Sequence, residues 1–471
     1  MQLQERPVPG LGTPRPVRPQ PTGPRLGAGW ALALMFGGLF VWWFLGLSGF
    51  VQGIFAVPLL IALLARRRGV AMPRAFWLWL LFLGFMFASA SQLNDINNAL
   101  SWGWRMTIYV ASTIIFLFVY NSSRQRLPAK TLINILAAFW VLTVIGGLMG
   151  MALPNHTFHS LMQSVMPQHF LSNSFVKALV IPSTTGGKAF PGLGIYRVKA
   201  PFIYTNQWGS AFALTLPFAF AVISQSRKSL HRLFFIGLLI VSVVPLVFSL
   251  DRGSWLSAGA GSAYGMFRLA RGGRRGRSAK MVRTARSLIF VGVVVGAVVL
   301  VSPLGVDILT RLNAGYGDTH RQLLYNSSLT LVGRSPVLGF GSPVSLNVLD
   351  PSAPPGPSVG THGTFWTVLV SNGVPALVFF VSWLLAAFLK TRKRIAGTGG
   401  RNAEAHFWFH VVIFTAIIQL PYYELLPWGL PIVMLAAAAA LRERVPLWQP
   451  EPAGLPLKAP VPIGGLPPPR T

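Results

Sequence analysis

The feature that most constrains this chain is a series of apolar stretches, each close to 20 residues long and followed by a short polar segment. A helix of about 20 residues is as long as the hydrocarbon core of a bilayer is thick. Because 52% of the residues are hydrophobic and only 11% are charged, the pattern predicts an all-α polytopic membrane protein with about 12 transmembrane helices. The predicted spans are 28–46, 49–65, 75–92, 103–120, 131–152, 205–224, 232–250, 253–268, 287–303, 364–389, 405–421 and 425–441.

The spans divide the chain into a Pro- and Arg-rich tail at 1–27, a membrane domain at 28–441 and a Pro-rich tail at 442–471. Of the 40 Lys and Arg residues, the side that carries both tails holds 31 and the opposite side holds 9. Cytoplasmic loops are the ones enriched in Lys and Arg, so we expect a multi-pass protein with both termini in the cytoplasm.

The net charge of +30 would suggest a nucleic-acid partner in a soluble protein. In this chain the charges fall in short runs between apolar stretches, so membrane lipids with anionic headgroups are the expected partner and nucleic acid is not. The chain has no Cys, which excludes disulfides, thiolate nucleophiles and Cys-ligated metal sites.

Two outer segments, about 153–204 and about 304–363, are too long to be simple turns, and we expect the function to lie there. The acids on that side are isolated in sequence, which predicts no site for Mg²⁺ or Mn²⁺, and we expect no cofactor. The outer cations are more numerous and suit the binding of an anion. These acids are Asp95, Asp251, Asp307, Asp318, Asp350 and Glu424, and the cations include Arg105, Arg197, Lys199, Arg252, Arg311, Arg321 and Arg334.

Four stretches occur in an order that is typical of one family. They are KAPFIYTNQWGSAFALTLPFAF at 199–220, FSLDRGSWLSAGAG at 248–261, GDTHRQLLYNSSLTLVGRSPVLGFG at 317–341 and THGTFWTVLVSNGVPALVFF at 361–380. Together they resemble the O-antigen ligase and O-antigen polymerase family of bacterial membrane glycosyltransferases. The resemblance implies a glycosyltransferase type C-like fold in the bacterial cytoplasmic (inner) membrane. It also implies a polyprenyl diphosphate-linked glycan as donor and a lipid or glycan as acceptor.

Three positions depart from the family pattern. Asp251 stands directly before Arg252 and is placed to pair with it. The His-Asn pair of the family is His362-Gly363 in this chain, which removes the Asn side chain. The last motif continues Gly373-Val374-Pro375-Ala376, with a proline after the glycine. These departures bear on the acceptor chemistry more than on the fold.

The resemblance assigns catalysis to His362, which would take the proton of the acceptor hydroxyl, and His320 is the alternative base. Arg252 and Arg321 would bind the diphosphate, which suits the two-pronged guanidinium group. From the residues alone other interpretations remain open: Arg252 extends to lipid headgroups or pairs with Asp251, and Arg321 pairs with Asp318 on a surface helix.

Arg197 and Lys199 precede a span and are further candidates for diphosphate binding, although headgroup anchoring explains them equally well. Asn206 and Trp208 lie side by side with Gln207, and an aromatic face next to amides suits a sugar or acceptor. Gly339 and Gly341 follow Pro336 and predict a turn and not a phosphate-binding loop.

The expected function is therefore metal-independent, inverting transfer of a glycan from a polyprenyl diphosphate carrier to an acceptor hydroxyl, as in an O-antigen ligase. One alternative is a polymerase that joins carrier-linked repeat units. Another is a transporter or flippase of lipid-linked glycans, which would call for broken helices and ionisable residues at mid-span depth. An inactive scaffold is the remaining alternative.

Overall fold

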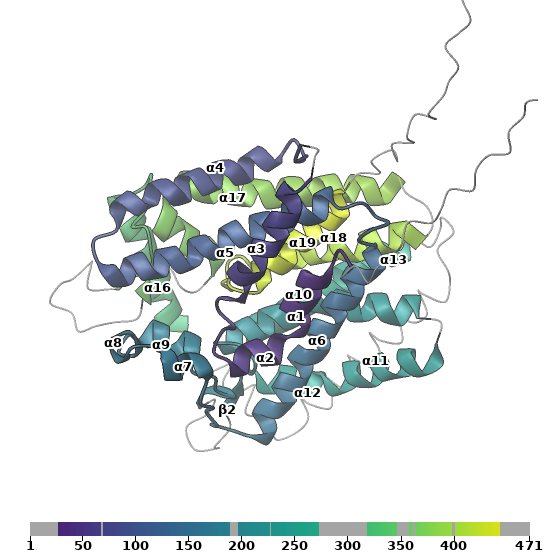
Figure 1. The fold of residues 1–471 in the computed structure, drawn as a ribbon, viewed down its shortest axis with the longest axis horizontal. Helices are drawn as coiled ribbons and strands as arrows, with labels where there is room; N and C mark the ends of the chain where they lie inside the picture. The colour runs from purple at the N-terminus through teal and green to yellow at the C-terminus, as the bar shows by residue number, and fades with distance from the viewer. Residues whose placement is uncertain are drawn as a thin grey trace, which may run out of the picture.

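The computed structural model describes residues 27–66, 69–188, 196–226, 228–272, 318–345, 358–359, 363–397 and 401–442. Helices dominate this part of the chain (Figure 1). They are α1 (Trp30–Gly37), α2 (Leu39–Phe44), α3 (Val51–Leu64), α4 (Phe76–Ala88), η1 (Ser89–Gln92), α5 (Ile96–Asn121), α6 (Ala129–Ala152), α7 (Leu161–Val165), α8 (Gln168–Leu171), α9 (Ser174–Val180), α10 (Thr205–Gln225), α11 (Ser229–Val241), α12 (Val243–Phe248), α13 (Arg252–Gly272), α16 (Asp318–Arg334), α17 (Thr364–Gly397), α18 (Arg401–Gln419) and α19 (Gly429–Leu441). Strand β1 (Thr185–Lys188) pairs antiparallel with β2 (Tyr196–Val198), and β3 (Val344–Ser345) pairs antiparallel with β4 (Ser358–Val359).

The all-α architecture is confirmed. Five helical segments are long and apolar enough to cross a membrane, namely 96–121, 129–152, 205–225, 229–248 and 364–393. The segment 229–248 consists of α11 and α12 in succession. Each predicted span within the described residues coincides with one helix or with two successive helices, and the predicted span 287–303 lies outside them. The chain therefore has the helices of a multi-pass membrane protein.

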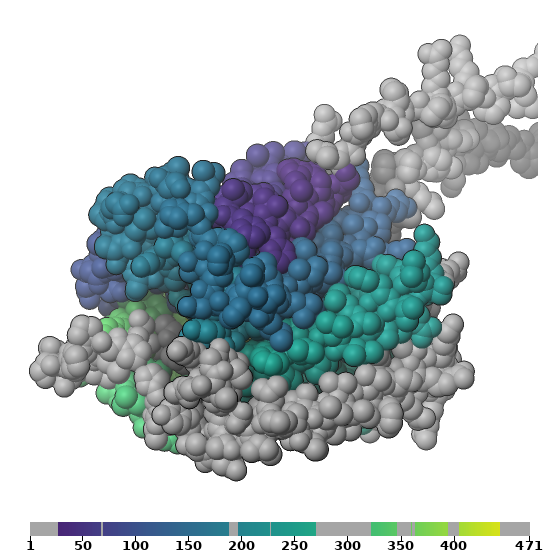
Figure 2. All heavy atoms as spheres, turned by 90° about the horizontal axis from the view of Figure 1, so that it is seen from below, coloured from purple at the N-terminus to yellow at the C-terminus, as the bar shows by residue number. Residues whose placement is uncertain are grey.

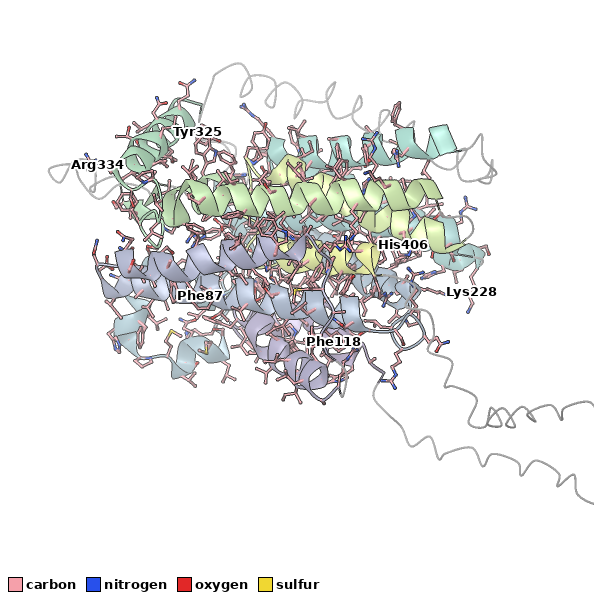
Figure 3. All side chains as sticks on the ribbon, turned by 90° about the horizontal axis from the view of Figure 1, so that it is seen from above. Phe87, Phe118, Lys228, Tyr325, Arg334 and His406 are labelled. Atoms are coloured by element: carbon pink, nitrogen blue, oxygen red, sulfur yellow. The ribbon has the colours of Figure 1, made fainter. Side chains whose placement is uncertain are left out.

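The long helices run side by side, so the bundle has two distinct ends (Figure 1). One end, which we name the loop end, carries α7, α8, α9, β2 with its partner β1, and α16 with the β3–β4 pair against it. The opposite end, which we name the basic end, carries the cationic connections that begin at Arg66, Arg124 and Lys228. Figure 3 shows Tyr325 and Arg334 at the loop end and Lys228 and His406 toward the basic end.

The segment 153–188 packs onto the bundle. Leu179, Val180 and Ile203 form a small apolar core against Phe50 and Trp104. Figure 2 shows this segment in blue, continuous with the purple surface of α1 and α2. The segment is thus part of the packed structure at the loop end.

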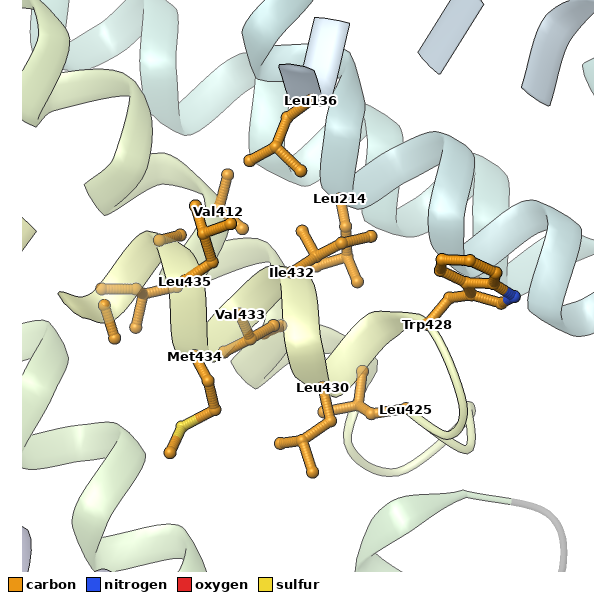
Figure 4. Close-up of a cluster of buried hydrophobic side chains, with 14 of the residues drawn as sticks. Leu136, Leu214, Val412, Leu425, Trp428, Leu430, Ile432, Val433, Met434 and Leu435 are labelled. Atoms are coloured by element: carbon orange, nitrogen blue, oxygen red, sulfur yellow. The ribbon is translucent and has the colours of Figure 1, made fainter. Parts of the chain in front are cut away.

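The centre of the bundle is α19, all of whose residues are buried. Its run of five alanines presents little side-chain volume, so the neighbouring helices approach closely. Leu136 of α6, Leu214 of α10 and Val412 of α18 surround it, as Figure 4 shows. Helix α10 is almost as deeply buried and packs against α6, α13 and α18.

Helix α17 is broken at Gly373, whose φ of 84° and ψ of 175° are not helical. The turn after α16 fills the break: Phe340 N–H donates to the Val370 carbonyl at 3.0 Å and Gly341 N–H donates to the Ser371 carbonyl at 2.8 Å. In return, Val374 N–H donates to the Pro336 carbonyl at 2.8 Å. The turn predicted at Gly339 and Gly341 therefore supplies the hydrogen bonds that the broken helix loses.

Candidate functional site

The connection between α18 and α19, which we name the 420–428 turn, is the meeting point of several helices at the loop end. Helices α10, α13 and α17 begin near it, as does α19 itself, and α5 contacts it through Arg105 in its third turn. Helix N-termini carry unpaired N–H groups and partial positive charge. The partial positive charges of these helix N-termini therefore add at the 420–428 turn. A negatively charged group is favoured there.

A buried ion pair joins α5 to the 420–428 turn. Arg105 Nη1 donates to Glu424 Oε1 at 2.7 Å, and the two side chains are 7% and 10% exposed. Thr367 Oγ1 of α17 donates to the other carboxylate oxygen, Oε2, at 2.6 Å. The guanidinium group of Arg105 also lies over the ring of Trp104. Glu424 thus ties the third turn of α5 to the first turn of α17.

Tyr423 extends this cluster toward α13. Its carbonyl accepts from both Thr364 N–H at 2.8 Å and Thr364 Oγ1 at 3.0 Å. Burial raises the pKa of the Tyr423 hydroxyl well above its usual value; Asp251 raises it further, and Arg197 acts in the opposite direction. A Cβ at Gly253 would lie 2.7 Å from the Tyr423 hydroxyl, so the Tyr423 ring packs on the first turn of α13.

Two of the predicted diphosphate ligands come from segments that meet at this point. Arg197 Nε, on β2, donates to the Ser249 carbonyl at 2.9 Å. Leu250 then adopts a left-handed φ of 48°, Asp251 is 5% exposed, and Arg252 opens α13 with a partly exposed side chain. The sharp turn brings the start of α13 beside β2 although the two are distant in sequence.

Lys199 lies between β2 and α10. Burial lowers the pKa of its ammonium group to about 8. Arg105 also influences Tyr204, at the N-cap of α10: burial raises the pKa of Tyr204, and Arg105 opposes the rise.

Asn206 and Trp208 lie in different environments in the structure. Asn206 is partly exposed in the first turn of α10, and its Oδ1 is a buried atom without a hydrogen-bond partner. Trp208 is fully buried: its indole N–H donates to the Thr143 carbonyl at 2.9 Å, and its ring stacks on Phe212. The Trp208 ring belongs to the packed interface of α6 and α10, so the structure does not present it to a sugar.

The side chains of three predicted site residues lie outside the described part of the structure. His362 lies outside the described residues, directly before Gly363, which packs against Pro421. Arg321 and His320 lie on the backbone of α16, and their side chains are outside the described set. The structure thus brings together Arg197, the Asp251–Arg252 turn and the start of α10.

Sequence reasoning did not select Arg105, Thr367, Tyr423 or Glu424 for the site. A signal was present, because Arg105 falls inside a predicted span and Glu424 is the one acid between the last two spans. Charged residues at such depths persist when they are paired or functional.

Within the described part of the chain, no group of three or more His, Asp or Glu side chains is placed to hold a metal ion. The chain matches no protein-family model, and comparison with curated proteins gives no significant match.

Proposed function

We propose that this chain is a membrane glycosyltransferase of the O-antigen ligase type, which transfers a glycan from a polyprenyl diphosphate carrier to an acceptor hydroxyl. One observation carries the proposal: Arg197, Lys199 and Arg252 gather with several helix N-termini at the loop end. The oxygens of Glu424 are engaged by Arg105 and Thr367, and the buried Asp251 is a single carboxylate among these three cations. Such a region suits a diphosphate.

The proposed reaction is a direct displacement and needs no nucleophile from the protein. The acceptor oxygen attacks the anomeric carbon, the bond from that carbon to the diphosphate oxygen breaks, and the configuration inverts. His362 takes the acceptor proton, and Arg252 and Arg321 stabilise the charge that develops on the departing diphosphate, with Arg197 and Lys199 beside them. The ion pair of Arg105 and Glu424 holds α5 against the start of α17 beside this centre.

The proposed setting is the bacterial cytoplasmic membrane, with twelve spans and both termini in the cytoplasm. Single cysteines at exposed Ser164 of α7 and exposed Ser229 of α11 test the orientation in this Cys-free chain. Impermeant maleimide should label the cysteine at position 164 in intact spheroplasts and should label the one at 229 only after lysis. The reverse pattern would place the site in the cytoplasm and refute the proposal.

The activity test uses purified full-length protein and a radiolabelled carrier-linked glycan. Arg252→Ala should weaken donor binding at least tenfold, since a charge-assisted contact is worth about 1.5–3 kcal/mol. Lys177→Ala, which removes an exposed cation on α9 at the same end, is the matched control and should have no effect. His362→Gln should lower turnover by about 10²–10⁴ with donor binding unchanged, whereas His169→Gln should not. Normal turnover of His362→Gln would remove His362 as the base.

A polymerase remains the first alternative, because it would use the same donor. The labelled donor given alone distinguishes the two: a polymerase lengthens the carrier-linked glycan, and a ligase releases it only to a separate acceptor. Transfer in excess EDTA should proceed at the untreated rate.

The transporter alternative calls for broken helices, and α17 is broken at Gly373. In transporters the freed carbonyl groups at such a break coordinate ions or substrate. In this chain the carbonyls of Val370 and Ser371 already accept from Phe340 and Gly341. The break therefore supports rigid positioning of the first turns of α17 more than it supports ion coupling.

A further inference from the structure

A groove runs between α10, α13 and α18 in the half of the bundle nearest the basic end. Helix α10 lines it with residues from 213–224, α13 lines it with residues from 258–269, and α18 contributes Trp408 and Val411. The lining residues that the structure describes are apolar apart from two serine hydroxyls and one indole N–H. The groove holds about 560 Å³ of space, part of it open to the surroundings. Sites for small ligands typically have roughly 300–1,000 Å³.

Small side chains on α13 leave this space unfilled. Gly265 faces the groove, and a Cβ at this position would come no closer than 3.6 Å to Val411. Phe220 of α10 and Ser262 and Met266 of α13 line the groove and remain partly exposed. The groove is therefore accessible from the side of the bundle.

The length of the groove matches one leaflet of a bilayer. At about 1.5 Å per residue, each of the walls 213–224 and 258–269 is about 16 Å long. Half of the hydrocarbon core of a bilayer is about 15 Å thick. Both walls end close to the last residues of their helices, Gln225 and Gly272, which lie toward the basic end. An apolar chain that enters from this end would fill the groove within a single leaflet.

Two buried N–H donors lie near the basic end of the groove, and neither has a hydrogen-bond partner within the described part of the chain. Trp408 is 5% exposed, its Nε1 is one of these donors, and its ring lies 6.0 Å from that of Phe220. The other is Nε2 of Gln225, the residue after Ser224 of the wall. Because these groups only donate, a complementary ligand presents acceptors at this depth.

A phospholipid has this distribution of groups. Its acyl chain is apolar, and its ester and phosphate oxygens are acceptors without donors. Lys228 is exposed just beyond α10, and Arg268 is partly exposed next to the lining residue Leu269, so cations flank the end where a phosphate group would lie. A further transmembrane helix would suit the two donors less well, since its carbonyl groups already accept within the helix.

We propose that this groove binds one acyl chain of an anionic phospholipid from the leaflet at the basic end. The ester and phosphate oxygens of the lipid lie at the level of Trp408 and Gln225, and the chain extends along α10 and α13 toward the middle of the bundle. The site lies away from the loop end and does not depend on the proposed transfer reaction.

Native mass spectrometry of the full-length chain in a nonionic detergent tests the site, with dipalmitoyl phosphatidylglycerol as the probe. The first lipid should bind more tightly than all later ones. Ser262→Phe places a ring in the partly exposed part of the groove and should lower this first affinity at least tenfold. Ala263→Phe adds the same ring to the exposed side of α13 and should change the affinity less than twofold. Equal effects of the two variants would mean diffuse lipid contact and would overturn the proposal.

A second pair of variants tests the hydrogen-bond donor. Trp408→Phe keeps an aromatic ring and removes the N–H group, so the first affinity should fall about threefold to tenfold. Trp383→Phe removes another buried indole N–H that has no partner in the described structure, but this residue lies on α17, outside the groove lining. Its lipid affinity should stay unchanged. Equal affinities of the two variants would contradict the proposed site.

Photo-crosslinking locates the chain directly. A phosphatidylglycerol with a diazirine in the middle of one acyl chain should label peptides of α10 and α13, and Ser262→Phe should remove this label. Label on the exposed apolar face of α11, which carries Leu230 and Leu233, should remain. Thermal unfolding monitors the fold of each variant. If Ser262→Phe bound the lipid normally but unfolded at a much lower temperature, another segment such as the predicted span 287–303 would fill the groove, and the proposal would be wrong.

Discussion

Arg105 and Glu424 form a buried ion pair at 2.7 Å although 319 residues separate them in the chain. Removing one partner from such a pair leaves a buried charge without compensation, which costs about 3–5 kcal/mol. Glu424→Gln should therefore lower the thermal unfolding temperature of the detergent-solubilised protein strongly.

The double variant R105Q/E424Q should lose less unfolding free energy than the two single variants added together. Neither charge is left unpaired in the double variant. Asp95→Asn is the matched control on α5: it removes an acid but keeps the N-cap bond to Asn98 N–H, so its unfolding temperature should stay close to that of the unmodified protein. Additive losses in the double variant would argue that the pair is not coupled.

The glycine of the turn that fills the α17 break allows a direct test. Gly339 has a φ of 64°, and a Cβ there would lie 2.4 Å from the Val370 carbonyl oxygen. Gly339→Ala should therefore destabilise the protein by about 1–3 kcal/mol. Gly333→Ala, in α16 with nothing within 4 Å of its Cβ position, should be neutral or slightly stabilising. Equal behaviour of the two variants in thermal unfolding would show that the close contact is absent.

A polar chain crosses three helices near the basic end. Thr391 Oγ1 of α17 and Tyr264 hydroxyl of α13 each lie 2.7 Å from a ring nitrogen of fully buried His410 on α18. Thr391→Val should lower the unfolding free energy by about 1–3 kcal/mol, because it leaves His410 Nδ1 buried and unpaired. Thr330→Val changes an exposed threonine with the same helical back-bond, and its unfolding free energy should shift by no more than about 0.5 kcal/mol.

Lys199 predicts a pH dependence of donor binding. Its pKa of about 8 means that the ammonium group loses its proton as the pH rises from about 7 to 9, so the affinity for a diphosphate donor should fall over that range. Lys199→Arg should move the fall to higher pH, while Lys177→Arg should not. Equilibrium binding of the carrier-linked glycan measures the effect.

Folding stability should change in the opposite direction. Above pH 8 the unfolded chain still binds the Lys199 proton that the folded chain has released, so the contribution of Lys199 to stability rises with pH up to its unfolded pKa. A fall of affinity caused by unfolding would show a parallel loss of the unfolding temperature. The two measurements therefore separate titration of the site from loss of the fold.

Much of the fold follows from hydropathy. The positions of α5, α6, α10 and α17 were predictable, because each is a long apolar run between charged or turn-forming residues. The turn at Gly339 was also predictable. Its insertion into α17 was not, since the partner of Gly339 is the backbone of Val370, and backbone carbonyls leave no trace in a sequence.

The site was harder to predict because its contacts join distant segments. Nothing near Arg105 in the sequence points to Glu424. The motifs did lead to Arg197 and Arg252, which the Ser249 carbonyl and the turn at Leu250 bring into one region. Adjacency in sequence did not predict the environment of Trp208. Its neighbours Asn206 and Gln207 suggested a ligand contact, whereas the helical rotation of α10 turns the indole toward Thr143.

The burial of α19 has a consequence for biosynthesis. This helix is made after all the others that the structure describes, yet it occupies the middle of the bundle. At about 5–20 residues per second, the first helices are therefore synthesised tens of seconds before the helix that fills the centre of the bundle. Glu424 and Tyr423 are made with the same segment, so their contacts with Arg105, Thr367 and Thr364 do not exist before it. A nascent chain that stalls before α19 would leave Arg105 in the bundle without Glu424, its ion-pair partner.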